Sequence, residues 1–260
     1  MSLSNSQSTL KEAPRIRAGI GGWTFEPWRN NFYPKGLAHS KELAYASRQL
    51  TAIEVNGTYY STFKLATFAK WRDETPDGFM FSLKANRFAT NRKLLATAGE
   101  SIERFVNSGI AELGAKLGPV VWQFMPTKKF ERDDFEAFLK LLPAAVGCVK
   151  LRHVLDVRHE SFHDAAYLPL ARRYGCATVH TDSEKFPAIA DDTSELAYLR
   201  LMRTSPGCPT GYPAAEIGKW AQGARAWIDK GAQREVLTFF ISGAKERAPA
   251  AAMELIRQLA

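Results

Sequence analysis

Short runs of aliphatic, β-branched and aromatic residues recur along the chain, and longer stretches with apolar residues three and four positions apart separate them. The short runs are typical of buried strands, and the longer stretches are typical of helices with one apolar face. The predicted strands cover residues 17–21, 53–56, 79–84, 120–124, 154–158, 177–181, 197–202 and 236–241. This alternation of two periodicities predicts an α/β fold built on a parallel sheet.

Two of the predicted helices have well-marked ends. Residues 101–117 place apolar side chains on one face, and Gly118 followed by Pro119 ends the pattern. The next helix opens at Asp133 with a capping sequence that has a glutamate three residues later, and Pro143 ends it. Both helices carry an apolar stripe of the kind that packs on a sheet.

Eight strands that alternate with helices over most of the chain predict a TIM (β/α)8 barrel in a single domain. An open, doubly wound sheet shows the same alternation and remains the alternative. Between residues 182 and 196 the chain has Pro187 and a polar Asp-Asp-Thr-Ser run, so the sixth helix is predicted to be short or missing. We expect residues 1–14 to form a disordered tail and residues 15–260 to form the barrel.

The composition is that of an ordinary globular protein with an excess of basic residues. Hydrophobic residues make up 45% and charged residues 24%, and 35 Lys and Arg against 27 Asp and Glu give a net charge of +8. This balance favours anionic partners such as phosphates, nucleic acid or acidic metabolites. Three cysteines without C-x-x-C spacing, no signal peptide and no long apolar run predict a cytoplasmic protein that does not bind membranes.

Polar residues stand at or just beyond the carboxyl end of nearly every predicted strand, where a TIM barrel carries its active site. They are Glu54, Asn56, Lys84, Gln123, Asp156, Arg158, His159, Asp182 and Arg200, whereas the first strand ends at Gly21-Gly22-Trp23. Alternation along a strand places Glu54 and Asn56 on one side, and Asp156 and Arg158 on one side. This convergence indicates a functional site, and the alternative is that ion pairs such as Asp156–Arg158 only stabilise a polar rim.

The same rim is rich in basic and aromatic residues. The basic ones are Lys84, Arg87, Arg92, Lys93, Arg158, Arg200 and Arg203. Guanidinium groups donate paired hydrogen bonds to carboxylates and phosphates, although Arg92 and Lys93 fit a solvated loop equally well. The aromatic residues of the first loop are Trp23, Phe25, Trp28 and Tyr33. They would stack on a sugar or a base, or else plug the mouth of the barrel.

One apparent metal motif is not expected to bind zinc. Residues 159–163 read His-Glu-Ser-Phe-His and match the H-E-x-x-H pattern, but His159 directly follows a predicted strand instead of lying within a helix. His180 and Asp182 could join Glu54 and His159 around a divalent metal, yet their spacing carries no metal signature. We therefore predict no cofactor. No G-x-S-x-G, G-K-[ST] or G-x-G-x-x-G motif is present, which excludes nucleotide hydrolysis by those routes.

Several segments, in order along the chain, carry a recognisable set of motifs. The run Gly21-Gly22-Trp23-Thr24-Phe25 precedes Trp28 and Phe32-Tyr33-Pro34. The further segments are Glu54-Val55-Asn56-Gly57-Thr58-Tyr59-Tyr60, Phe81-Ser82-Leu83-Lys84-Ala85, Leu117-Gly118-Pro119 with Gln123 and Pro126, residues 156–162, and Tyr198-Leu199-Arg200. Together they resemble the motifs of the YecE-like family, domain of unknown function seventy-two, over nearly the whole chain.

The resemblance implies a TIM barrel and adds Tyr60 to the candidate substrate-binding residues. The activity of the family is not established, so the resemblance implies a site without a reaction. The chain departs from the family at Asn91, which stands for a histidine, and at Asp156, which stands for a glutamate. Met125 interrupts a double proline, and residues 241–242 replace an asparagine pair. A mechanism that needs that histidine or those asparagines is therefore not carried over.

Our leading hypothesis is an enzyme that acts on a small anionic, phosphate-bearing substrate by acid–base hydrolysis or isomerisation. The catalytic candidates are Glu54, His159 and Asp182. The substrate-binding candidates are Trp23, Asn56, Tyr60, Lys84, Gln123, Asp156, Arg158 and Arg200. In one alternative, the same basic rim binds nucleic acid or a phosphodiester. In another, the barrel top is a protein interface and binds neither kind of ligand.

Overall fold

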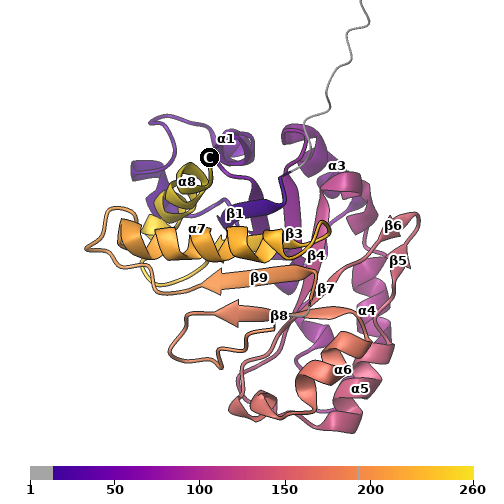
Figure 1. Ribbon diagram of the computed structural model, residues 1–260. Coiled ribbons are helices and arrows are strands. Elements are labelled where there is room, and N and C mark those ends of the chain that lie inside the picture. Colours follow the sequence, from indigo (N-terminus) through magenta and orange to yellow (C-terminus); the bar gives the residue numbers. More distant parts are fainter. Residues whose placement is uncertain (1–13, 192–193) are drawn as a thin grey trace, which may run out of the picture.

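Eight parallel strands close into a barrel in the computed structural model, which describes residues 14–191 and 194–260 (Figure 1). The strands are β1 (Ile16–Gly21), β2 (Ala52–Val55), β3 (Met80–Lys84), β4 (Leu117–Gln123), β7 (His153–Asp156), β8 (Cys176–Thr181), β9 (Leu196–Leu201) and β10 (Glu235–Phe240). The barrel closes where β1 pairs with β10, with Ile16 opposite Val236. The predicted single-domain TIM barrel is confirmed and the open sheet is wrong, whereas the predicted tail, residues 1–14, lies almost entirely outside the described residues.

Helices cover the outside of the barrel. They are α1 (Glu42–Gln49), α2 (Gly57–Tyr60), α3 (Leu65–Glu74), α4 (Gly99–Val106), α5 (Arg132–Lys140), α6 (Tyr167–Arg173), α7 (Ala214–Asp229) and α8 (Ala248–Leu259). The helices α4, α5 and α6 lie on one side of the barrel, and α7 and α8 pack together on another (Figure 1). A small hairpin, β5 (Ala145–Val146) and β6 (Val149–Lys150), stands between α5 and β7 and was not predicted. No helix in the described part of the chain is long and apolar enough to cross a membrane.

The single helix predicted over residues 101–117 is wrong. The helix α4 ends at Val106, and a 3-10 segment, η5 (Ile110–Lys116), follows it. Gly109 and Gly114 take φ values of +113° and +54°, which side-chain-bearing residues rarely adopt, and these turns divide the helix. The predicted apolar face still packs inward, because Ile102, Phe105 and Ile110 are buried.

The connection between β8 and β9 differs from the others in the barrel. No helix occurs among its described residues, 182–191 and 194–195, as the sequence predicts. The outer faces of β8 and β9 consequently lack the cover that a sixth helix would provide.

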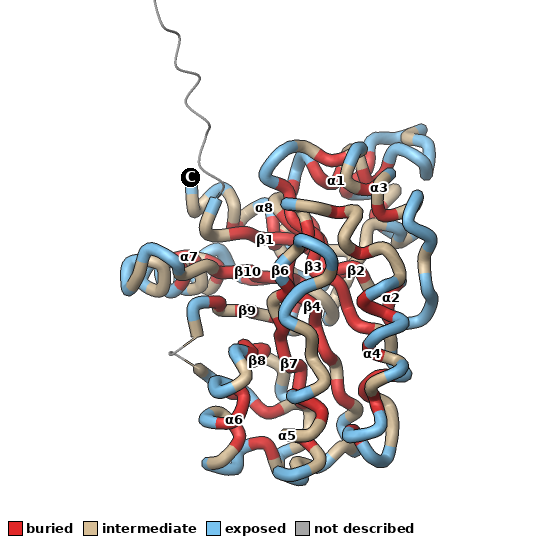
Figure 2. Tube along the Cα trace, turned by 90° about the vertical axis from the view of Figure 1, so that its right-hand side faces the viewer, coloured by how far each residue is buried: buried red, intermediate tan, exposed pale blue. Residues whose placement is uncertain are grey.

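Side chains that alternate along each strand divide the core into two layers. On β3, Phe81 and Leu83 point outward and pack beneath the helices, whereas Met80 points into the barrel. The barrel interior below its carboxyl end is apolar, with residues such as Leu237 and Phe239 fully buried. The trace of the strands is accordingly buried, and the exposed segments lie in the outer helices and loops (Figure 2). The inward positions nearest the carboxyl ends of the strands carry polar side chains instead.

Candidate functional site

Five charged side chains meet inside the carboxyl end of the barrel. We call Glu54, Lys84, Asp156, Arg158 and Arg200 the charged cluster. Glu54 lies in β2, Lys84 ends β3, Asp156 ends β7, and Arg200 lies in β9. These four are at most 5% exposed. Strand alternation points all of them inward above the apolar layer, so their charges must be balanced by one another or by a ligand.

Arg200 links the two carboxylates of the charged cluster. Its Nε and Nη2 donate to the two oxygens of Glu54 at 3.0 and 3.1 Å, and its Nη1 donates to Asp156 Oδ2 at 2.7 Å. Tyr198 also donates its hydroxyl to Glu54, at 2.8 Å. Although burial opposes the charge, these carboxylates raise the pKa of Arg200 above its usual value. Arg200 is therefore a permanent cation that holds Glu54 and Asp156 in place.

Arg158 lies nearer the mouth of the barrel. Its Nη2 donates to Asp156 Oδ2 and to Gln123 Oε1, both at 2.8 Å, and its guanidinium stacks 4.5 Å from the ring of Phe186. Burial alone would raise the pKa of Asp156, but Arg200 and Arg158 lower it below its usual value. Asp156 is thus an anion shared between two arginines.

Lys84 differs from the arginines because its ammonium is not paired with a carboxylate. Among the described residues, its Nζ makes no hydrogen bond or ion pair and lies 4.5 Å over the ring of Tyr59. Burial first, and then the charge of Arg200, lowers the pKa of Lys84 to about 8, while Glu54 and Asp156 act in the opposite direction. Lys84 is thus the one cation of the cluster that has no carboxylate partner among the described residues.

Residues of the loops after β2 and β3 surround Lys84. The hydroxyl of Tyr59 and the side-chain amide of Asn91 lie 3.2 Å apart, so Asn91 borders the site. Tyr60 is 62% exposed and contacts Tyr59 edge-on at 5.0 Å. The amide of Asn56 is half-buried at the start of α2, where a Cβ on Gly21 would lie only 2.8 Å from its nitrogen. A glycine at position 21 therefore leaves room for that amide.

Three predicted site residues make their contacts elsewhere. The Nδ1 of His159 accepts from the backbone N–H of Ser161 at 3.1 Å and caps the 3-10 helix η6 (Glu160–His163). Asp182 accepts from the N–H of Met202 and from the hydroxyl of Tyr212, both at 2.6 Å. Trp23 packs edge-on against Trp71 of α3 at 5.1 Å, outside the barrel. The structure joins none of these three to the charged cluster by a hydrogen bond, whereas Gln123 is joined to it through Arg158.

The possible metal ligands do not come together. His180 points away from the barrel interior, with its ring 6.0 Å from that of Trp220, while Glu54 lies inside the barrel. The H-E-x-x-H segment lies on a loop and a short 3-10 helix, which does not give the helical spacing that zinc proteases require. Within residues 14–191 and 194–260, no group of three or more His, Cys, Asp or Glu side chains could hold a metal ion.

Two of the predicted basic residues beyond the cluster, Arg92 and Arg203, make contacts within the loops. Arg92 donates to the carbonyl oxygens of Phe88 and Thr97 and, at 2.7 Å, to the hydroxyl of Ser101. Arg203 pairs with Glu184 at 3.2 Å in an exposed position. These contacts lie within the loops, and none of them joins Arg92 or Arg203 to the charged cluster.

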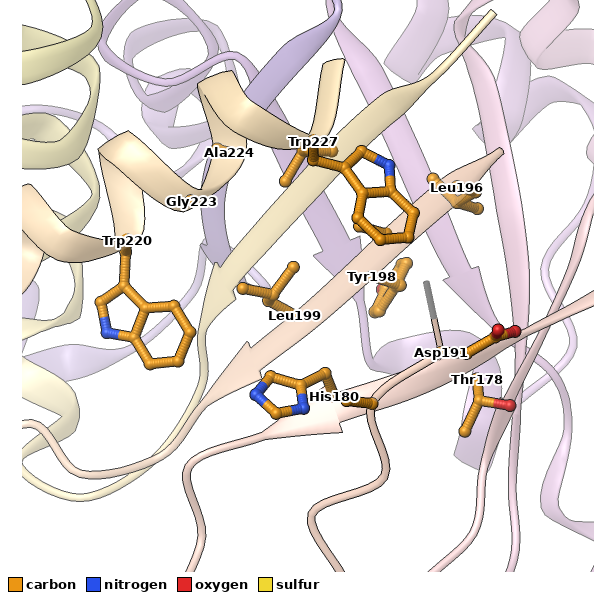
Figure 3. Close-up of a pocket in the computed structure, with 13 residues that line it drawn as sticks. Thr178, His180, Asp191, Leu196, Tyr198, Leu199, Trp220, Gly223, Ala224 and Trp227 are labelled. Atoms are coloured by element: carbon orange, nitrogen blue, oxygen red, sulfur yellow. The ribbon is translucent and has the colours of Figure 1, made fainter. Parts of the chain in front are cut away.

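An apolar pocket of about 210 Å³ lies on the flank of the barrel, where the sixth helix is missing (Figure 3). Trp220 and Trp227 extend from α7 over Leu199 and the neighbouring strands, and His180 borders the opening. The pocket is lined by the outer faces of β8 and β9, so the barrel wall separates it from the charged cluster. No member of the charged cluster lines it.

Two residues that bind the cluster were not selected from the sequence. Tyr198 lies two positions before Arg200 and therefore points to the same side of β9, so strand alternation could have identified it. Tyr59 is adjacent to the selected Tyr60, but its ring rather than that of Tyr60 lies beneath Lys84. The turn of α2 determines which of the two faces inward, and the strand pattern does not extend to it.

Comparison with known proteins identifies a family without an established activity. The chain matches the sequence model of the family described as protein of unknown function DUF72 over residues 17–260. A crystal structure of a DUF72 family protein from Enterococcus faecalis V583 aligns with a TM-score of 0.73 and 16% identity, covering 94% of this chain and 95% of that one. One from Thermotoga maritima MSB8 aligns with a TM-score of 0.70 and 20% identity, covering 95% and 99%. A search of functionally curated proteins finds no match.

Proposed function

Since the chain belongs to the DUF72 family, we propose that it is an enzyme that binds a small anionic, phosphate-bearing substrate over the charged cluster. The observation that carries this proposal is the unpaired ammonium of Lys84 inside the barrel. With Lys84 protonated, the cluster holds three cations and two carboxylates, and Arg200 and Arg158 are already bonded to those carboxylates. A substrate anion would balance the remaining positive charge.

The geometry supports different roles for the members of the cluster. Lys84 and Arg158 would contact the substrate anion, and Arg200 would hold the carboxylates that face it. Glu54 is fixed by hydrogen bonds from Arg200 and Tyr198 and lies inside the carboxyl end of the barrel, so we assign it the role of general base. The amide of Gln123 would orient the substrate beside Arg158. We assign His159 and Asp182 no direct part, because their hydrogen bonds are made within their own loops.

Calorimetric titration with inorganic phosphate and a set of phosphorylated sugars tests this proposal. We expect Lys84→Ala and Arg158→Ala to weaken binding more than tenfold, because each removes a cation that faces the ligand. Lys70→Ala is the matched control, since Lys70 is an exposed lysine on α3, and it should leave binding unchanged. Arg200→Ala needs a parallel check of folding by circular dichroism, because it leaves two buried carboxylates unpaired. Less than tenfold loss in all three cluster variants would reject the proposal.

A second candidate function is the binding of single-stranded nucleic acid across the rim. Tyr60 and Phe88 are 62% and 61% exposed, and the guanidinium of Arg87 lies 5.9 and 5.5 Å from their rings. Exposed aromatic rings beside a cation are typical of surfaces on which bases stack. This candidate requires contacts with several phosphates, whereas the first requires one, so the two predict different responses to salt.

A further inference from the structure

Lys84 is placed as a reactive amine as well as a cation. Its side chain is 5% exposed, and its backbone is fixed because the hydroxyl of Thr58 donates to its carbonyl oxygen at 2.7 Å. A lysine used only for structure normally pairs with a carboxylate when it is buried. Glu54 and Asp156 belong to the same cluster, but Arg200 occupies both of them.

We propose that the Nζ of Lys84 forms a Schiff base with the aldehyde or ketone group of a small phosphorylated substrate. This inference rests on the proposed function, because the phosphate of the same molecule is bound on the Arg158 side of the cluster. The nitrogen adds to the carbonyl carbon and gives a carbinolamine, which loses its hydroxyl as water. The ammonium and the carbonyl thus become a protonated imine and one molecule of water, and no oxidant or reductant is consumed.

The surroundings of Lys84 favour the neutral form of its amine, which is the form that such a reaction needs. Only the neutral amine is nucleophilic. Burial next to other cations disfavours the charged form, so a larger fraction of the lysine is neutral. With a pKa of about 8, roughly a tenth of Lys84 is neutral at pH 7, compared with less than about a thousandth of an ordinary lysine. The charged groups that act on Lys84 are Arg200, Glu54, Asp156 and Arg158.

The same groups would serve the steps that follow. The protonated imine is a cation, as the ammonium was, and the negative charges of Glu54 and Asp156 nearby favour it. An imine also acidifies the neighbouring C–H bond, and Glu54 can accept that proton to leave an enamine. Within the proposed function, this favours isomerisation, or the making or breaking of a bond beside a carbonyl, over simple hydrolysis.

Reductive trapping tests the inference directly. The protein is incubated with glycolaldehyde phosphate, reduced with sodium borohydride, and mapped by peptide mass spectrometry, which separates Lys84 from other lysines and from the α-amino group. We expect one predominant adduct at Lys84, at least tenfold above that at exposed Lys70, with a rate that rises with pH to a midpoint near 8. Labelling of Lys84 that is no greater than that of Lys70 would overturn the inference.

Two controls separate this inference from the proposed function. Lys84→Arg keeps the positive charge and removes the reactive amine, so it should lose the adduct, while phosphate binding is measured separately on the unsubstituted protein. Lys70→Arg should retain both the adduct at Lys84 and the binding of phosphate. If phosphate binds but Lys84 is not trapped, the Schiff base is rejected and the anion site stands. If uncharged glycolaldehyde labels Lys84 as efficiently as its phosphate and phosphate does not bind, the Schiff base stands and the anion site is rejected.

Discussion

Lys84 is a residue whose charge opposes folding, although the proposed function uses that charge to bind a ligand. Its pKa is about 8 in the folded protein and near 10.5 in the unfolded chain, so the unfolded state binds the proton more tightly. The charge of Lys84 therefore destabilises the fold below pH 8, and stability rises with pH between about 8 and 10.5. Without Lys84, the positive charges of the two arginines equal the negative charges of the two carboxylates in the cluster.

Lys84→Met is consequently expected to stabilise the protein at pH 7. The free energy of unfolding should rise by an amount on the order of 2 kcal/mol. This is less than the full pKa difference implies, because methionine does not make all the packing contacts of the lysine side chain. Urea unfolding of both proteins at pH 7 and pH 10.5 measures the effect, and the gain should shrink at the higher pH. A Lys84→Met variant that is less stable at pH 7 would show that the ammonium stabilises the fold.

The residues of the charged cluster show which parts of the candidate site can be predicted from strand alternation. Glu54, Lys84, Asp156 and Arg200 could be selected from the sequence because inward positions near the carboxyl ends of the strands converge in a closed barrel. The same rule does not decide the role of His159, because its ring is oriented by a turn beyond the strand. The hydrogen bonds made by a residue in a turn depend on local backbone angles, which hydrophobic periodicity does not encode.

At the level of the elements, the divided helix after β3 shows a related distinction. Its apolar face was predicted correctly, because both an α-helix and a 3-10 helix can keep residues three apart on one side. Its division was not predicted, because a glycine within an apolar pattern is compatible with a continuous helix. Gly109 permits the break through its φ of +113°, and the position requires glycine because a Cβ there would lie 2.8 Å from Leu65 Cγ and 2.9 Å from Leu65 Cα.

Gly109→Ala should therefore destabilise the protein by about 2 kcal/mol, since the alanine meets both an unfavourable φ of +113° and a steric clash. The matched control is Gly223→Ala within α7, where a Cβ would have no neighbouring atom within 4 Å. Alanine there should stabilise the protein by about 0.5–1 kcal/mol. Thermal unfolding of both variants tests the pair, and equal effects would contradict the conformational argument.

For the whole molecule, closure of the barrel determines which charged side chains are brought together at its carboxyl end. The net charge of +8 attracts anions to the surface in general, without selecting a site. The barrel gathers three cations in its carboxyl end, but two carboxylates balance most of that charge. Under the proposed function, the cluster would bind a small ligand with one anionic group, and a longer polyanion would have to use the exposed rim as well.

The salt dependence of binding distinguishes these two kinds of ligand. Raising NaCl from about 50 to 200 mM should weaken the binding of a single phosphate group by no more than about threefold, because buried charges are screened little. A single-stranded oligonucleotide that contacts six or more phosphates should lose about a hundredfold or more over the same range. Fluorescence titration of a phosphorylated sugar and of an oligonucleotide, at both salt concentrations, measures both slopes. Tight oligonucleotide binding with a steep slope, and no binding of the sugar phosphate, would favour the nucleic-acid function over the enzyme.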